Sequence, residues 1–407
     1  MSELKFPNGF LWGTATAAHQ IEGNNTNNQW WEWEHNKDYS TGMDKVMGKK
    51  RKWPLEPSGI ACDSYNRYEE DFDLCVEMNN NAVRFSVEWS RLEPTEGVYN
   101  QDEFDHYKKV IEAARSRGLK VYLTLHHFTN PVWFERMGAF ANAKAHVYFS
   151  RFAKKCADQF GDSVDAYLTI NEPQVYTMQS YLTGEWPPQK INPIYSIIVQ
   201  LNLLYCHRKA FDAIKSVNKN LKVGLVKHIV WYESFSPWYK IWDHILVKVL
   251  YWLNCDMYLW PIKNKLDLIG LNHYFTSRFK DLKSDNANDL VSDLGWWLYA
   301  PGLENILIHL RKYNVPIYVT ENGLADKDDI NRKWFLKEML TACHNAISKG
   351  VDLKGYFYWS LLDNYEWHQG YWPRFGIINI DRENDLKRIP QPSAKYYAEI
   401  AKNNSVV

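Results

Sequence analysis

The stretch YLTINEPQV, residues 167–175, decides the fold, because an apolar, β-branched run ends in an amide and a carboxylate. Asn171 and Glu172 close this run, and Pro173 then stops the strand. The stretch PIYVTENGL, residues 316–324, repeats the pattern and ends at Glu321 and Asn322. A buried strand that finishes in polar groups is typical of parallel sheets that present functional residues at their carboxyl ends. Both stretches are therefore predicted to be strands of one parallel sheet.

The rest of the chain repeats the same alternation of a β-rich run and a helical segment. The eight runs are residues 10–16, 82–88, 120–126, 166–172, 222–228, 267–273, 316–322 and 355–361. Near-continuous apolar strands that alternate with helices favour a parallel sheet covered on both faces. Eight such units predict an α/β fold, a single-domain (β/α)8 barrel over residues 1–407, with the active site at the C-terminal ends of the strands. A doubly wound open sheet is the alternative, but no glycine-rich phosphate loop follows the first run.

The helical segments between the runs have apolar stripes and glycine stops. Residues 104–120 carry such a stripe and then Gly118, and residues 145–162 behave likewise up to Gly161. Residues 332–352 repeat the device before the eighth run. We find no low-complexity linker and no internal sequence repeat.

Composition and charge exclude several classes of partner. Lys plus Arg and Asp plus Glu both number 48, which favours neither nucleic acid nor an anionic membrane as a partner. No window of about 18 apolar residues exists, and residues 241–253 are interrupted by charged side chains. The N-terminus lacks the pattern of a secretory signal. The six cysteines are scattered, so we expect reduced packing thiols and a cytoplasmic enzyme.

The aromatic content is high, with 19 Trp, 26 Tyr and 18 Phe. Flat aromatic faces suit the C–H faces of sugar rings, while Trp N–H and Tyr O–H groups bond hydroxyls. Core packing explains the same composition equally well.

The chemistry of the predicted rim comes from two carboxylates. Glu172 and Glu321 end the fourth and seventh runs, so they are expected to face each other across the barrel mouth. Two such groups with hydroxyl-binding and aromatic neighbours fit glycosidic bond cleavage, in which one carboxyl is protonated and the other ionised. Arg84 and Tyr274 are of the right type to keep Glu321 ionised, and Asn171 to bond a sugar 2-hydroxyl. His126 and His127 are adjacent on a strand and point to opposite faces, which disfavours a metal pair.

Seven motifs together resemble those of the retaining β-glycosidases of glycoside hydrolase family 1. They are FPNGFLWGTATAAHQIEG, VRFSVEWSRLEPTEG, TLHHFTNP, LTINEP, IGLNHY, VTENG and WSLLDNYEWHQGYWPRFGI. They follow the family order and span residue 6 to about residue 397, so the resemblance covers practically the whole chain.

The resemblance implies roles for individual residues. Glu172 would be the general acid/base and Glu321 the nucleophile, with Arg84, Asn272 and Tyr274 as their supporting residues. The positions that match the family's sugar-binding residues are Gln20, His127, Asn171, Glu366 and Trp367, with Trp359 as the platform beneath the sugar and Trp296 at the leaving-group side. Trp297 is adjacent to Trp296, and either ring could face the cleft. The resemblance implies no cofactor and no metal.

The substrate expected is an unphosphorylated β-glycoside or oligosaccharide, with β-glucosides first and β-galactosides or β-fucosides plausible. Glu366 stands where relatives that act on 6-phosphorylated sugars differ, and its carboxylate would repel a phosphate. The chain is shorter than most relatives, chiefly between residues 188 and 266, which leaves the aglycone preference open. A transglycosylase shares every residue named, and a catalytically silent sugar-binding barrel is the other alternative. The sequence does not define the oligomeric state.

Overall fold

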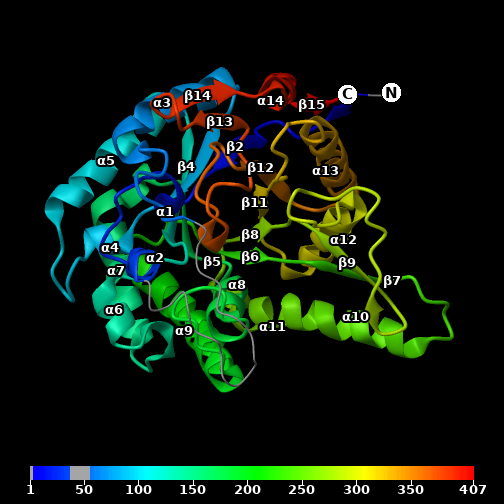
Figure 1. Ribbon diagram of the computed structural model, residues 1–407, viewed down its shortest axis with the longest axis horizontal. Helices are drawn as coiled ribbons and strands as arrows, with labels where there is room; N and C mark the ends of the chain where they lie inside the picture. Colours follow the sequence, from blue (N-terminus) through cyan, green and yellow to red (C-terminus); the bar gives the residue numbers. More distant parts are fainter. Residues whose placement is uncertain (1–2, 37–55) are drawn as a thin grey trace.

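The computed structural model describes residues 3–36 and 56–407, and its centre is a closed barrel of eight parallel strands (Figure 1). The barrel strands are β2 (Leu11–Ala15), β3 (Ala82–Ser86), β4 (Lys120–His126), β5 (Ala166–Asn171), β6 (Val223–His228), β8 (Leu268–Asn272), β11 (Ile317–Asn322) and β12 (Leu353–Trp359). They pair in chain order, and β12 closes on β2. All eight β-rich runs are therefore barrel strands, and the predicted fold class is confirmed. The eighth strand begins two residues earlier than its predicted run.

Helices surround the barrel on its outside (Figure 1). The longer ones are α3 (Ser64–Glu77), α5 (Gln101–Ser116), α7 (Ala145–Phe160), α8 (Pro173–Tyr181), α9 (Pro193–Val217), α10 (Ile241–Asn254), α12 (Ala300–Leu310), α13 (Arg332–Ser348) and α14 (Pro392–Asn403). Short helices are α1 (Ala18–Ile21), α2 (Gln29–His35), α4 (Trp89–Leu92), α6 (Val132–Arg136) and α11 (Asp256–Leu259). The predicted glycine stops occur: Gly118 and Gly161 follow α5 and α7 with φ of +80° and +52°, a conformation that glycine adopts without steric cost.

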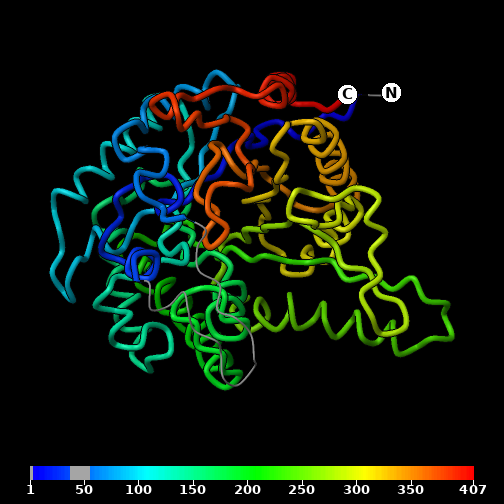
Figure 2. The backbone as a smooth tube through the Cα atoms, in the orientation of Figure 1, coloured from blue at the N-terminus to red at the C-terminus, as the bar shows by residue number. Residues whose placement is uncertain are grey.

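Three small sheets lie outside the barrel. β7 (Trp231–Ser234), β9 (Thr276–Lys280) and β10 (Lys283–Ser284) extend from the β6 and β8 side, and β13 (Ile378–Asp381) pairs with β14 (Lys387–Pro390). β1 (Leu4–Lys5) pairs with β15 (Ser405–Val406), so the described ends of the chain lie side by side (Figure 2).

Two buried clusters form the core. The barrel interior combines small residues such as Ala15 and Ala166 with Tyr122 and Phe357, whose ring centroids are 5.1 Å apart. A larger cluster lies between the strands and the helices. The interior is therefore a packed core and not a pore, and chemistry is left to the strand ends.

Candidate active site

A cavity of about 420 Å³ opens at the C-terminal ends of the barrel strands. The predicted residues that line it are Gln20, His127, Glu172, Tyr274, Trp296, Glu321, Trp359, Glu366 and Trp367. The other three predicted residues, Arg84, Asn171 and Asn272, are buried and bond these groups from below. The structure thus brings all twelve predicted residues together.

Glu172 is positioned by an abrupt change from strand to helix. It follows β5 with a left-handed backbone, φ +41°, which is uncommon for a residue other than glycine. Pro173 then opens α8 at the first helical position, where its missing N–H is not needed. The Glu172 side chain therefore lines the cavity instead of continuing the strand.

Glu321 has partners that stabilise its ionised form. Arg84 Nη1 donates to its Oε1 and forms a buried ion pair with it, and the Tyr274 hydroxyl donates to its Oε2. Arg84 also donates from Nη2 to Asn171 Oδ1 at 2.7 Å. Burial raises the pKa of Glu321, and the Arg84 charge and the Tyr274 hydrogen bond oppose that rise. A guanidinium in contact with the carboxylate makes Glu321 the glutamate that carries the negative charge.

Glu172 has no ionic contact of this kind among the described residues. Its Oε1 accepts a hydrogen bond from Asn272 Nδ2 at 2.7 Å. Burial and then the nearby charge of Glu321 raise the pKa of Glu172 to about 8, against smaller opposing effects of Asn272, Arg84 and Lys227. Glu172 is therefore suited to hold a proton at neutral pH.

Further polar and aromatic groups line the cavity. Gln20 Nε2 donates to Glu366 Oε2 at 3.3 Å and to the Tyr365 carbonyl at 2.8 Å. The His127 ring stacks near Trp359 and Trp367, with centroids 5.9 and 6.1 Å away. Burial, followed by the charge of Glu321, raises the pKa of Glu366 to about 8.

The ambiguity between Trp296 and Trp297 is resolved by their contacts. Trp296 lines the cavity and lies 5.7 Å from the Tyr274 ring. Trp297 is buried, donates from Nε1 to Asp289, and stacks on Tyr299 at 4.8 Å. Trp296 is the ring that faces the cleft.

His126 and His127 diverge, as adjacent strand residues do. His126 contacts Asn130 at 3.0 Å and packs against Phe140 on the helical side, whereas His127 faces the cavity.

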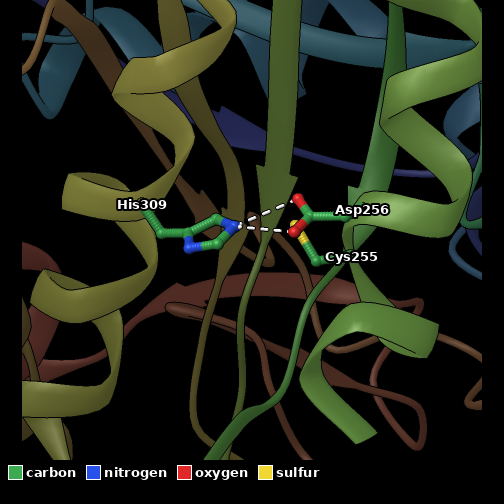
Figure 3. Close-up of side chains that lie close together, drawn as sticks. All are labelled: Cys255, Asp256 and His309. Carbon is green, nitrogen blue, oxygen red and sulfur yellow. Dashed lines mark hydrogen bonds and ion pairs between the residues drawn. The ribbon is translucent and has the colours of Figure 1, made fainter. Parts of the chain in front are cut away.

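A separate group consists of Cys255, Asp256 and His309, whose possible metal-ligand atoms all lie within 4.8 Å of one another (Figure 3). Lys312 Nζ lies 2.7 Å from Asp256 and 2.6 Å from His309 Nε2, and burial raises the pKa of the Cys255 thiol to about 12. The Lys312 ammonium occupies the space between Asp256 and His309, so these side chains form an ion-pair network.

Sequence reasoning missed two residues at the end of β6. His228 lines the cavity, and Lys227 is fully buried beside it. Lys227 Nζ donates to Gln174 Oε1 at 2.6 Å and to the His228 carbonyl, and burial lowers its pKa to about 7. The signal was available, because residues 222–228 formed the fifth predicted run and end in these two basic side chains.

The barrel, the two glutamates and the aromatic cleft together define a sugar-cleaving (β/α)8 enzyme. The model of glycosyl hydrolase family 1 matches residues 2–241 and 256–406, so the chain belongs to that family and is a β-glycosidase.

Individual relatives agree with this assignment. The chain is 31% identical over 458 residues to β-glucosidase A of Thermotoga maritima, with 100% of both chains covered. It is 33% identical over 401 residues to the galactolipid galactosyltransferase SFR2 of Arabidopsis thaliana, covering 91% of this chain and 63% of that one. The solved β-glycosidase of Pyrococcus horikoshii superposes with a TM-score of 0.88 at 34% identity, covering 100% of this chain and 97% of that one.

Proposed function

We propose that the chain is a retaining exo-β-glycosidase that hydrolyses unphosphorylated β-glycosides, β-glucosides foremost. The observation that carries the proposal is the unequal environment of the two glutamates. Arg84 and Tyr274 contact Glu321, whereas Glu172 accepts a neutral hydrogen bond from Asn272. A nucleophile must be ionised and a general acid must be protonated, and these surroundings favour that distribution.

The reaction then takes two displacements. In the first, a Glu321 oxygen attacks the anomeric carbon while the Glu172 proton passes to the glycosidic oxygen. The bond between the anomeric carbon and the glycosidic oxygen breaks, and the aglycone leaves as an alcohol. In the second, the Glu172 carboxylate takes a proton from water, and the water oxygen attacks the anomeric carbon. Glu321 leaves as a carboxylate, and two inversions give net retention.

Binding roles are supported by the cavity lining and by the resemblance to the family motifs. The sugar hydroxyls would be bonded by Gln20, His127, Asn171, Glu366 and Trp367. Trp359 would form the platform beneath the sugar ring, and Trp296 would contact the leaving group. The choice of a glucoside is supported by the name of the Thermotoga maritima relative, a β-glucosidase. The exclusion of a 6-phosphate rests on Glu366, whose carboxyl lies in the field of the Glu321 charge and offers a phosphate no positive partner.

The test is a panel of aryl β-glycosides that differ only in the sugar, with the first product followed by NMR. Retention predicts that the β-anomer of the free sugar appears first and mutarotates later. Initial release of the α-anomer would refute the double displacement.

A second activity, transfer of the glycosyl group to another acceptor, is favoured by one relative. The Arabidopsis thaliana protein is named a galactosyltransferase. Transfer uses the same first step and differs only in which hydroxyl attacks the intermediate. Product analysis at rising acceptor concentration would separate the two, because a transferase yields glycosylated acceptor in excess of free sugar.

We also propose a cytoplasmic location. All six cysteines are buried and free, which fits a reducing compartment.

A further inference from the structure

α10 has apolar residues on both of its faces. Asp243, Val247 and Tyr251 form the buried face. The outward face carries Trp242, Ile245 and further apolar side chains, and its only exposed charged residue is Lys248. A helix on the surface of a globular protein normally turns polar residues outward. None of the helices in the described residues, α10 included, is long and apolar enough to cross a membrane.

The exposed apolar surface extends beyond the helix. We define the α10 face as Trp238, Trp242, Ile245, Val249, Trp252 and Trp260. Trp238 is 84% exposed, Trp242 67% and Trp260 64%. An apolar surface of this kind, rich in exposed tryptophan, marks an interaction site.

This face is a local feature of the chain. The match to the family model stops at residue 241 and resumes at residue 256, which leaves out almost all of α10. In Figure 1, α10 extends along the lower right edge of the molecule, and α11 lies between it and α9. Gln200 of α9 bonds Met257 Sδ just after α10, at 3.9 Å. The neighbouring part of α9, residues 193–205, contains no charged residue.

Two exposed lysines of the α10 region, Lys248 and Lys263, form no ion pair among the described residues, whereas Lys240 pairs with Asp281 and Lys265 pairs with Asp212. Residues 235–265 contain two acidic groups, and both are engaged: Asp243 accepts from Ser236 and from backbone N–H groups, and Asp256 pairs with Lys312. Lys248 and Lys263 are exposed, and Lys263 Nζ lies 4.8 Å above the Trp260 ring. The face therefore presents tryptophan and lysine together, although the whole chain is balanced in charge.

We propose that the α10 face docks on the surface of an anionic lipid bilayer, with α10 lying in the plane of the interface. Tryptophan is enriched at the level of lipid headgroups, and lysine keeps its stem on apolar surface while its ammonium meets phosphate. The core of a protein–protein interface is instead depleted in lysine, which makes a second copy of the chain the less suitable occupant. Asn254, the last residue of α10, lines the active-site cavity, so docking holds the cleft beside the bilayer.

The experiment is flotation of the full-length protein with vesicles of phosphatidylcholine alone or mixed with phosphatidylglycerol. We expect the wild type to float with the mixed vesicles, less with phosphatidylcholine, and less again at 1 M salt. The triple variant Trp238→Gln, Trp242→Gln, Trp252→Gln should lose binding. The double variant Lys248→Gln, Lys263→Gln should weaken binding by about fivefold for each lysine. All five positions are exposed, so the fold and the hydrolysis of a soluble aryl glucoside should be unchanged.

Trp334→Gln is the matched control, because Trp334 is a 40% exposed tryptophan on α13, away from α10 (Figure 1). Wild-type protein that does not float would overturn the proposal. Equal flotation of the triple variant would also overturn it. So would a dimer in sedimentation velocity that the triple variant abolishes and that excludes vesicles, because a second copy would then cover the face.

Discussion

Replacing Glu172 by alanine should remove proton donation while leaving Glu321 and its partners in place. Burial and the charge of Glu321 raise the pKa of Glu172 to about 8, so its carboxyl is mostly protonated at pH 7 and available as an acid. General acid catalysis contributes about 10²–10⁴-fold, and we expect a loss of that size in kcat/KM for alkyl or unactivated aryl glucosides. For a dinitrophenyl glucoside, whose leaving group needs no proton, the loss in the first step should be less than about tenfold.

The assay is kcat/KM for a series of aryl glucosides of falling leaving-group pKa, together with the burst of phenol from the dinitrophenyl substrate. Azide should accelerate the second step in Glu172→Ala and give the β-glycosyl azide. Glu172→Gln is the matched control, because its amide oxygen can still accept from Asn272 while it donates no ionisable proton. Equal losses for good and poor leaving groups would refute the assignment of Glu172 as the acid.

Three further changes probe the neighbouring groups. Glu321→Gly should lower hydrolysis by more than about 10⁴-fold, and azide should restore turnover with the inverted, α-glycosyl product; recovery of β-azide would exclude Glu321 as the nucleophile. Arg84→Met should raise the Glu321 pKa by about 1–3 units and so move the acid limb of the kcat/KM profile to higher pH. An acid limb that does not move would contradict the ion-pair argument. Burial lowers the pKa of Lys227 to about 7, so Lys227 is mostly uncharged at the alkaline limb near pH 8, and Lys227→Met should leave that limb nearly in place. A marked shift of the alkaline limb to higher pH in Lys227→Met would instead mean that Lys227 keeps its positive charge beside Glu172.

The barrel was predictable because its strands carry their own signal. Each run is apolar, short and bounded by a helical segment, and residues such as Asn171 and Glu321 mark the end that faces the site. The boundaries were less certain: the eighth strand begins at Leu353, because Leu353 pairs with Ile317 of β11 before the predicted run starts. Register between strands depends on neighbours that are distant in sequence, which a local pattern does not contain.

Two parts of the molecule were beyond the sequence pattern. Trp296 and Trp297 lie in a loop without periodicity, so only tertiary contacts select the ring that faces the cleft. In α10 the outward face is apolar and the buried face includes Asp243 and Asn254, so its sequence gives no clear inward side. From the sequence, residues 241–253 were judged only for their ability to span a membrane, and charged residues interrupt them too often for that. This test does not detect a helix that lies on the membrane surface.

The charge count of the cavity links the mechanism to the substrate. Glu172, Glu321 and Glu366 are all buried or nearly so, and Arg84 is in ionic contact with Glu321 alone. Because an unpaired charge is costly in such a site, one carboxylate ionises at Arg84, and its negative charge raises the pKa of the other two. The same field that keeps Glu172 protonated for catalysis would oppose a substrate phosphate beside Glu366. An uncharged sugar is therefore the ligand that the cavity can bind without placing a further negative charge beside Glu321.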